Sequence, residues 1–150
     1  MDVNLIFNIT NDGILIFWLL LIVAPGWRGT QLVVHSIAIP VVLGLTYLWL
    51  FASSFIIGPP LPEGSSFFSL TGVMTLFQSP VALTAGWIHY LVFDLFVGAW
   101  EARDATRRGF PRWLLIVCLV VTLMVGPIGL MLYLLLRTAL GKGGLSLSES

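Results

Sequence analysis

A histidine and an aspartate lie inside a stretch of sequence that otherwise has the character of a membrane-spanning helix. His89 and Asp94 both fall within the apolar run from residue 86 to residue 100. An ionisable side chain at the centre of a bilayer helix costs about 2.5–3.5 kcal/mol on insertion scales. A chain with 9% charged residues has little reason to place two of them there unless they pair, bind a ligand or transfer protons.

The composition indicates an integral membrane protein of one domain. The chain has 150 residues, of which 58% are hydrophobic, and its mean hydropathy is +1.01. Soluble domains are about 45–50% apolar and about 25% charged. The formal net charge is zero, so we expect no nucleic-acid partner. Cys118 is the single cysteine, which excludes an internal disulfide and a cysteine metal cluster.

Four apolar stretches have the roughly 20 residues that a bilayer crossing requires. They run from about Leu5 to Ala24, from Gln31 to Phe51, from Pro80 to Trp100 and from Trp113 to Leu136. Pro40 predicts a kink in the second span, because a proline inside a helix removes a backbone hydrogen bond.

The segment from Phe67 to Phe77 is apolar but too short to cross a bilayer, so we expect a short interfacial or re-entrant helix there. The predicted fold class is therefore all-α, an integral membrane four-helix bundle with a short interfacial or re-entrant helix before span three. Residues 1–140 form the four-span transmembrane domain. Residues 141–150 are rich in glycine and serine and are predicted to be a disordered tail.

The orientation follows from the basic residues, which favour the cytoplasmic side. With four spans, the loops after spans one and three share one side, and the C-terminal tail lies on the other. The first side carries five basic residues, which are Arg28, Arg103, Arg107, Arg108 and Arg112. The second side carries two, which are Arg137 and Lys142. This distribution predicts that both termini lie outside the cytoplasm. The start of the chain lacks the basic region of a signal peptide, so we expect the first helix to be retained.

Three roles are open to the polar residues of the third span. In a structural role, Asp94 pairs with Arg137 or accepts a hydrogen bond from Asn11, and His89 bonds to a neighbouring carbonyl. A metal role has suitable ligand types, but the sequence contains no closely spaced ligand pair and the two histidines lie at different depths, so we predict no metal. The residues weighed for it are His35, His89, Asp94, Glu101 and Asp104.

The third role is general acid and base chemistry on a lipophilic molecule. Imidazole and carboxyl groups near the middle of a membrane can protonate and deprotonate a substrate dissolved in lipid. We therefore predict His89 and Asp94 as catalytic residues. The residues predicted to bind the ligand are polar or aromatic, and they are Asn11, Trp18, His35, Tyr90, Phe93 and Glu101. Trp18 also fits an interfacial aromatic belt, and the charged residues from 101 to 112 fit a solvated turn.

Several motifs resemble a known family. The third span contains the run GWIHYLVFDLFVG at residues 86–98, followed by PRW at 111–113 and VGPIGLMLY at 125–133. Further matches are FFSL at 67–70 with the later Pro80, and Asn11 with the FW pair at 17–18. Together these motifs resemble the abscisic-acid-deficient-four-like membrane proteins, the family of plant neoxanthin synthase and its bacterial relatives.

The resemblance implies a four-span protein that is linked to xanthophyll metabolism. Plant members are tied to the conversion of an epoxide end group into an allenic one, an isomerisation that needs an acid, a base and no cofactor. The implied partner is a carotenoid or another lipid in the membrane; the oligomeric state stays open. The chain begins almost directly at span one, which favours a bacterial inner-membrane protein over a plastid one. The alternative function is a non-catalytic carotenoid- or lipid-binding or assembly protein.

Overall fold

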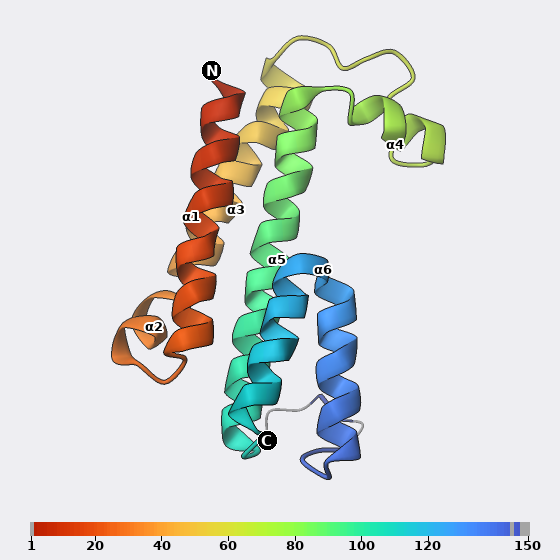
Figure 1. The fold of residues 1–150 in the computed structure, drawn as a ribbon. Helices are drawn as coiled ribbons and strands as arrows, with labels where there is room; N and C mark the ends of the chain where they lie inside the picture. The colour runs from red at the N-terminus through yellow and green to blue at the C-terminus, as the bar shows by residue number, and fades with distance from the viewer. Residues whose placement is uncertain (1, 145, 148–150) are drawn as a thin grey trace. The chain divides into compact units, whose positions relative to one another are not determined.

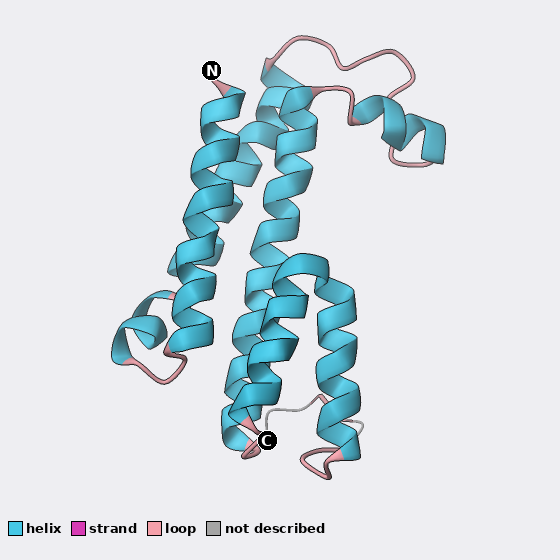
Figure 2. Cartoon of the chain, in the orientation of Figure 1, coloured by secondary structure: helices cyan, strands magenta, loops and turns pink. Residues whose placement is uncertain are grey.

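The structure, a computed structural model, describes residues 2–144 and 146–147. The regular structure of these residues is helical, as Figure 2 shows. Four of the helices described are long and apolar enough to cross a membrane. They are α1 (Val3–Val23), α3 (Ala38–Ala52) with its π-helical continuation η1 (Ser53–Ile57), α5 (Pro80–Arg107) and α6 (Arg112–Ala139). The all-α membrane class predicted from the sequence is confirmed.

Two short helices accompany the long ones. Helix α2 (Arg28–Val33) follows α1, and helix α4 (Leu70–Leu76) precedes α5. The Ser69 side chain caps α4 by accepting a hydrogen bond of 3.1 Å from the backbone N–H of Gly72, which satisfies one of the free donors of the first turn. The predicted short helix before span three is thus confirmed.

The second span begins later than predicted. Its first part, including Gln31, belongs to α2, and the chain turns at residues 34–37 before α3 starts at Ala38. The predicted kink at Pro40 is wrong, because Pro40 is the third residue of α3, where a missing N–H breaks no helical hydrogen bond. His35 consequently lies in the turn before the span and not inside it.

The described part of the chain divides into two compact units. Unit 1 comprises Met1–Ile14 and Ala38–Val92, and unit 2 comprises Leu15–Ile37 and Phe93–Ser150. Helix α5 is central in each of them. In unit 1 its residues contact α1 and α3, and in unit 2 they contact α1 and α6. Helix α5 therefore contacts each of the other long helices within one unit or the other.

Helix α6 is broken at its middle. Val125 has φ −149° and ψ 66°, outside the helical region, and Figure 1 shows the second half of α6 returning beside the first half. A Cβ atom added to Gly129 would overlap the backbone of Thr122, whereas residues seven positions apart in a straight helix are separated by about 10 Å. Helix α6 is therefore a hairpin of two half-helices.

The two halves of this hairpin, 112–124 and 126–139, are each about 20 Å long at 1.5 Å per residue. A crossing of the hydrocarbon core needs about 30 Å. Near the base of the hairpin, the rings of Phe110 and Tyr133 lie 5.2 Å apart. The second half thus ends beside the loop from which the first half starts.

This geometry bears on the predicted orientation of the termini, which stays a prediction. The loop after α5 and the C-terminal residues were expected on opposite sides of the membrane. Instead, a Cβ added to Gly143 would lie 3.1 Å from Arg108 Nη1, so both segments occur at the same end of unit 2. Residues 145 and 148–150 of the predicted disordered tail lie outside the described residues. The backbone carbonyls of Gly144 and Ser146 accept hydrogen bonds from Arg137.

Candidate functional site

Unit 1 contains a cavity of about 220 Å³ with mostly aromatic walls. Helix α3 and η1 form one side of the cavity, α5 forms another, and α4 with its flanking residues forms a third. The lining residues are Tyr47, Phe51, Phe55, Phe67, Leu76, Phe77, Ala82, Ala85, Gly86 and His89. Among these residues, the Tyr47 hydroxyl and the His89 imidazole are the polar side-chain groups.

The aromatic wall follows from a regular spacing in the sequence. Tyr47, Phe51 and Phe55 stand four residues apart, which places them on one face of a helix. Their ring centroids are 6.0 Å and then 4.4 Å apart, and the series continues from Phe55 to Phe67 at 5.6 Å. Such offset aromatic contacts give a rigid apolar surface, to which the flat hydrocarbon end of a lipid can bind.

His89 stands at the edge of this wall, with its ring centroid 6.0 Å from that of Tyr47. One turn earlier on α5, Gly86 lets the Phe77 ring approach, since an added Cβ would lie 3.0 Å from that ring. His89 is exposed and borders an open cavity. An imidazole in this position can exchange a proton with a molecule bound against the aromatic rings.

A second group of predicted ligand residues lies on another side of α5 in the same unit. The indole N–H of Trp87 donates a hydrogen bond of 3.1 Å to Asn11 Oδ1 on α1. The Tyr90 ring lies 5.2 Å from the Trp87 ring, and Phe7 packs at 5.9 Å from the other side. These contacts tie α1 to α5.

Unit 2 contains a buried network of polar side chains between α5 and the α6 hairpin. Thr122 donates its hydroxyl hydrogen to the Glu101 carboxylate at 3.1 Å. Asp104 accepts a hydrogen bond of 2.7 Å from the Tyr133 hydroxyl and forms an ion pair of 2.9 Å with Arg137. Three of these side chains, Glu101, Asp104 and Arg137, are at most 1% exposed. Such burial is tolerated because each charged group has a partner.

The network corrects two predictions. Glu101 and Asp104 were expected in a solvated turn, but α5 continues to Arg107 and the hairpin covers both carboxylates. In the structural role considered for Asp94, Arg137 was one of two possible partners, the other being Asn11, but the Arg137 guanidinium pairs with Asp104. A four-span topology would have placed Arg137 at the other side of the membrane from Asp104, so only a folded-back helix permits this pair.

Asp94 lies against the break of the hairpin. A Cβ added to Gly126 would overlap the Asp94 carboxylate, so only a glycine allows this close approach. The second half of α6 starts here, and the N-terminus of a helix carries a partial positive charge that favours a nearby carboxylate. This contact gives Asp94 a physical role in holding the tip of the hairpin.

The remaining predicted ligand residues lie in different surroundings of unit 2. Trp18 is 1% exposed and packs against Gly98, so it is a core residue, and the interfacial-belt prediction for it is wrong. Phe93 is exposed, and His35 contacts Arg103 at 3.2 Å. No group of three potential metal ligands occurs among the described residues.

The sequence analysis missed the aromatic residues of α3 and its continuation. Their signal was available as the spacing of Tyr47, Phe51 and Phe55. Aromatic residues at helical spacing are equally typical of ordinary packing in a membrane helix, so this spacing alone does not indicate a ligand site. The location of a side chain does not test its function, so the roles predicted for His89, Asp94 and the ligand residues stay predictions.

These features define a multi-pass helical membrane protein with an aromatic cavity and a broken fourth apolar helix. The chain belongs to the ABA DEFICIENT 4-like family, whose sequence model matches residues 5–133.

A curated relative is Protein ABA DEFICIENT 4, chloroplastic, from Arabidopsis thaliana. It is 28% identical over 116 residues, which cover 69% of this chain and 48% of the relative. The chain therefore spans about half the length of that protein. No solved structure matches the chain.

Proposed function

We propose that this protein binds a carotenoid-like lipid and isomerises its end group, with His89 as the group that exchanges the proton. The aromatic cavity beside His89 is the observation that carries the proposal. Membership of the ABA DEFICIENT 4-like family, which the resemblance links to xanthophyll metabolism, supports the choice of lipid. A xanthophyll with an oxygenated ring is the substrate class we expect.

The dimensions of the cavity support binding of an end group and not of a whole lipid. Its volume of about 220 Å³ is below the roughly 300–1,000 Å³ of pockets that enclose a drug-sized ligand. The ring of the substrate would lie against Phe51 and Phe55, and its chain would extend into the surrounding lipid. The exposed position of His89 lets such a ligand enter from the membrane.

The chemistry requires removal of a proton from carbon and protonation of the epoxide oxygen as the carbon–oxygen bond breaks. One group can do both in turn when the proton that it takes from carbon is the proton that it delivers to oxygen. The double bonds shift between the two positions, so atoms and electrons balance without an oxidant or a reductant. A neutral imidazole removes a proton, and an imidazolium donates one. We assign this exchange to His89. Asp94 lies in the other unit against Gly126, and the catalytic role predicted for it stays a prediction.

A pigment assay tests the proposal and separates the two residues. The protein is produced in a carotenoid-making host that supplies epoxidised xanthophylls, and pigments are analysed together with the amount of folded protein. His89→Gln should accumulate normally and lose nearly all conversion, because general acid–base groups contribute about 10²–10⁴-fold. Asp94→Asn should convert in proportion to the folded protein that accumulates.

Asp12→Asn is the matched control, since it removes an exposed ionisable group of unit 1 outside the aromatic cavity. It should keep both accumulation and conversion. Full conversion by His89→Gln would refute the assignment. Normal accumulation with no conversion for Asp94→Asn would restore the sequence-based prediction of a second catalytic residue.

The second candidate is a non-catalytic carotenoid- or lipid-binding protein. The observation that favours it is the same aromatic wall, which suffices to hold an apolar ring without any proton transfer. A binding protein would co-purify with unchanged pigment in mild detergent, and His89→Gln would leave the pigment profile as it is.

A further inference from the structure

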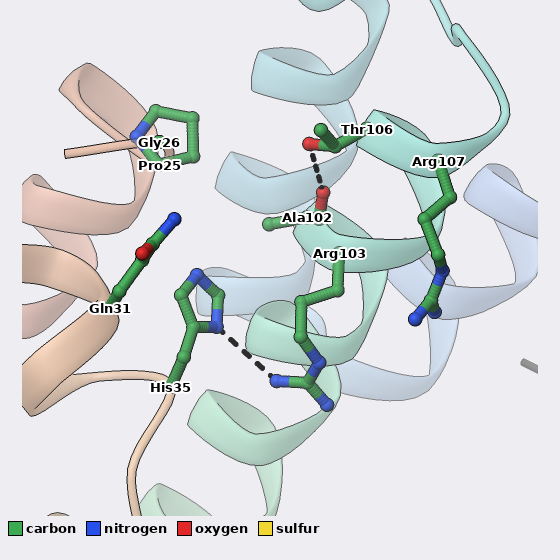
Figure 3. A pocket seen from close by; sticks show the side chains of 8 residues that line it. All are labelled: Pro25, Gly26, Gln31, His35, Ala102, Arg103, Thr106 and Arg107. Atoms are coloured by element: carbon green, nitrogen blue, oxygen red, sulfur yellow. Dashed lines mark hydrogen bonds between the residues drawn. The ribbon is translucent and has the colours of Figure 1, made fainter. Parts of the chain in front are cut away.

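Unit 2 contains a second cavity, of about 440 Å³, between the α2 region and the last turns of α5. Figure 3 shows Gln31 and His35 on one side and Arg103 and Arg107 on the other. The other lining residues are Pro25, Gly26, Ala102 and Thr106. None of the described residues that line this cavity is acidic, which distinguishes it from the carboxylate network on the opposite side of α5.

The two arginines form a basic wall with a defined geometry. Arg103 and Arg107 stand one helical turn apart on the same face of α5, and both guanidinium groups point the same way in Figure 3. Guanidinium groups offer several N–H donors in a planar fork that matches the oxygens of a phosphate. Two of them at this spacing favour a tetrahedral anion over a single carboxylate.

His35 positions one of these arginines. The contact of 3.2 Å joins Arg103 Nη1 to His35 Nδ1, and because a guanidinium can only donate, Nδ1 is the acceptor. Burial is the main cause that lowers the pKa of His35, and the charge of Arg103 lowers it further. The neutral ring therefore orients Arg103 without adding a charge of its own.

The surroundings indicate that the anion comes from a lipid. Trp27, Leu32 and Ile37, which flank or belong to α2, are exposed by 58%, 68% and 80%. A short helix with such apolar residues beside basic ones is typical of a segment that lies in the membrane interface. All seven Lys and Arg residues of the chain belong to unit 2, and anionic lipids attract such a basic region.

We propose that this cavity binds the phosphate of an anionic phospholipid, with Arg103, Arg107 and Gln31 donating hydrogen bonds to its oxygens. The site is separate from the aromatic cavity of unit 1 and independent of the carotenoid proposal. The acyl chains of the lipid would lie along the exposed apolar residues of the α2 region. Bound in this way, the lipid would fix α2 against the end of α5.

Native mass spectrometry of the full chain in a non-ionic detergent tests the proposal. The probe is phosphatidylglycerol, and phosphatidylcholine and inorganic phosphate are the comparison ligands. Phosphatidylglycerol should bind more tightly than phosphatidylcholine. Arg107→Gln should weaken its binding about tenfold, as expected for one lost charge-assisted hydrogen bond. Arg107→Lys, which keeps the charge, should retain part of the affinity.

Arg28→Gln is the matched control, because Arg28 is exposed, belongs to unit 2 and does not line the cavity. It should change the affinity by less than about twofold, as exposed charges do. Equal weakening by Arg28→Gln and Arg107→Gln would mean diffuse attraction and would overturn the site. Binding of inorganic phosphate without phosphatidylglycerol would overturn the lipid assignment, and so would equal binding of the two phospholipids.

Discussion

The two units of this protein use the same helix for opposite purposes. In unit 1, α5 presents His89 to a cavity of aromatic rings, and the unit contains no lysine or arginine. In unit 2, α5 presents Glu101 and Asp104 to a hairpin that buries them, and the unit contains all seven basic residues. The exposed imidazole of unit 1 thus contrasts with the buried carboxylates of unit 2.

This difference shows how a helix in a membrane can carry several ionisable residues for unlike reasons. The carboxylates of unit 2 have fixed partners and glycine contacts, which is what structural groups require in an apolar medium. His89 borders open space beside aromatic rings, which is what a group that meets a ligand requires. Burial within the network and exposure beside the cavity separate the two roles.

The largest expected effect concerns the membrane side of the C-terminus. Because α6 folds back, a reporter fused after Ser150 should lie on the same side as one inserted at Thr106. All seven basic residues then occur at one end of unit 2. The positive-inside rule therefore predicts that both reporters are cytoplasmic. The N-terminus, at the other end of the 21-residue α1, should lie outside. Reporters on opposite sides of the membrane would mean that α6 crosses it.

Breaking the buried ion pair of unit 2 should strongly destabilise the protein. Arg137→Met removes the buried one of the two guanidinium groups that pair with Asp104, a residue that is 1% exposed, and leaves Arg108 at 2.7 Å. Removing one partner of a buried pair typically costs about 3–5 kcal/mol when the other charge is left uncompensated, and we expect the lower end of this range because Arg108 still pairs with Asp104. Thermal unfolding in detergent measures the loss, and Arg28→Met at an exposed position should cost far less. Equal melting temperatures for these two variants would show that the pair contributes nothing.

A methyl group at the tip of the hairpin should have a smaller effect. Gly126→Ala forces a Cβ into the Asp94 carboxylate, and overpacking of this kind costs about 1–3 kcal/mol. Gly44→Ala in α3 is the control, since nothing lies within 4 Å of its added Cβ. There we expect a slight gain of about 0.5–1 kcal/mol, because alanine favours helix. The comparison fails if both glycines tolerate alanine equally well.

The smallest effect should be a dependence on pH through His35. Burial first, and Arg103 second, lower its pKa below the ordinary 6.5. The unfolded chain therefore binds a proton at this residue before the folded protein does. The contribution of His35 to the stability should be constant above pH 6.5 and fall as the pH drops below that value. Melting curves over a pH series measure this slope, and His35→Gln should reduce it; an unchanged slope would exclude His35 as the cause.

Much of the fold followed from the sequence because hydrophobic length alone identifies candidate spans. The same criterion did not reveal the break in α6, because the two half-helices together have the residue count of one crossing. The signal for a break was visible as Gly126 and Pro127, but glycine and proline also occur in straight membrane helices. Two contacts show that α6 folds back, namely the contact of Gly129 with Thr122 and the ion pair of Asp104 with Arg137. Both are tertiary contacts, which the local sequence does not reveal.

The candidate site was predictable to a smaller degree. His89 was recognised from the cost of an imidazole in a membrane helix, but its exposure depends on which neighbours cover it. Glu101 was placed at a wet edge because the sequence around it is charged. Its burial comes from the α6 hairpin. A straight fourth span, as the sequence predicted, has no such returning half.

The division of labour between the units is tested most directly by pigment bound per folded protein. Phe51→Ala opens the aromatic wall of unit 1, and Leu45→Ala removes an exposed side chain of the same helix outside the cavity. Purified from a carotenoid-making host, Phe51→Ala should lose most of its pigment, and Leu45→Ala should keep it. Gly126→Ala, in unit 2, should yield less folded protein with an unchanged pigment ratio. A pigment ratio that survives in Phe51→Ala and falls in Gly126→Ala would contradict the account.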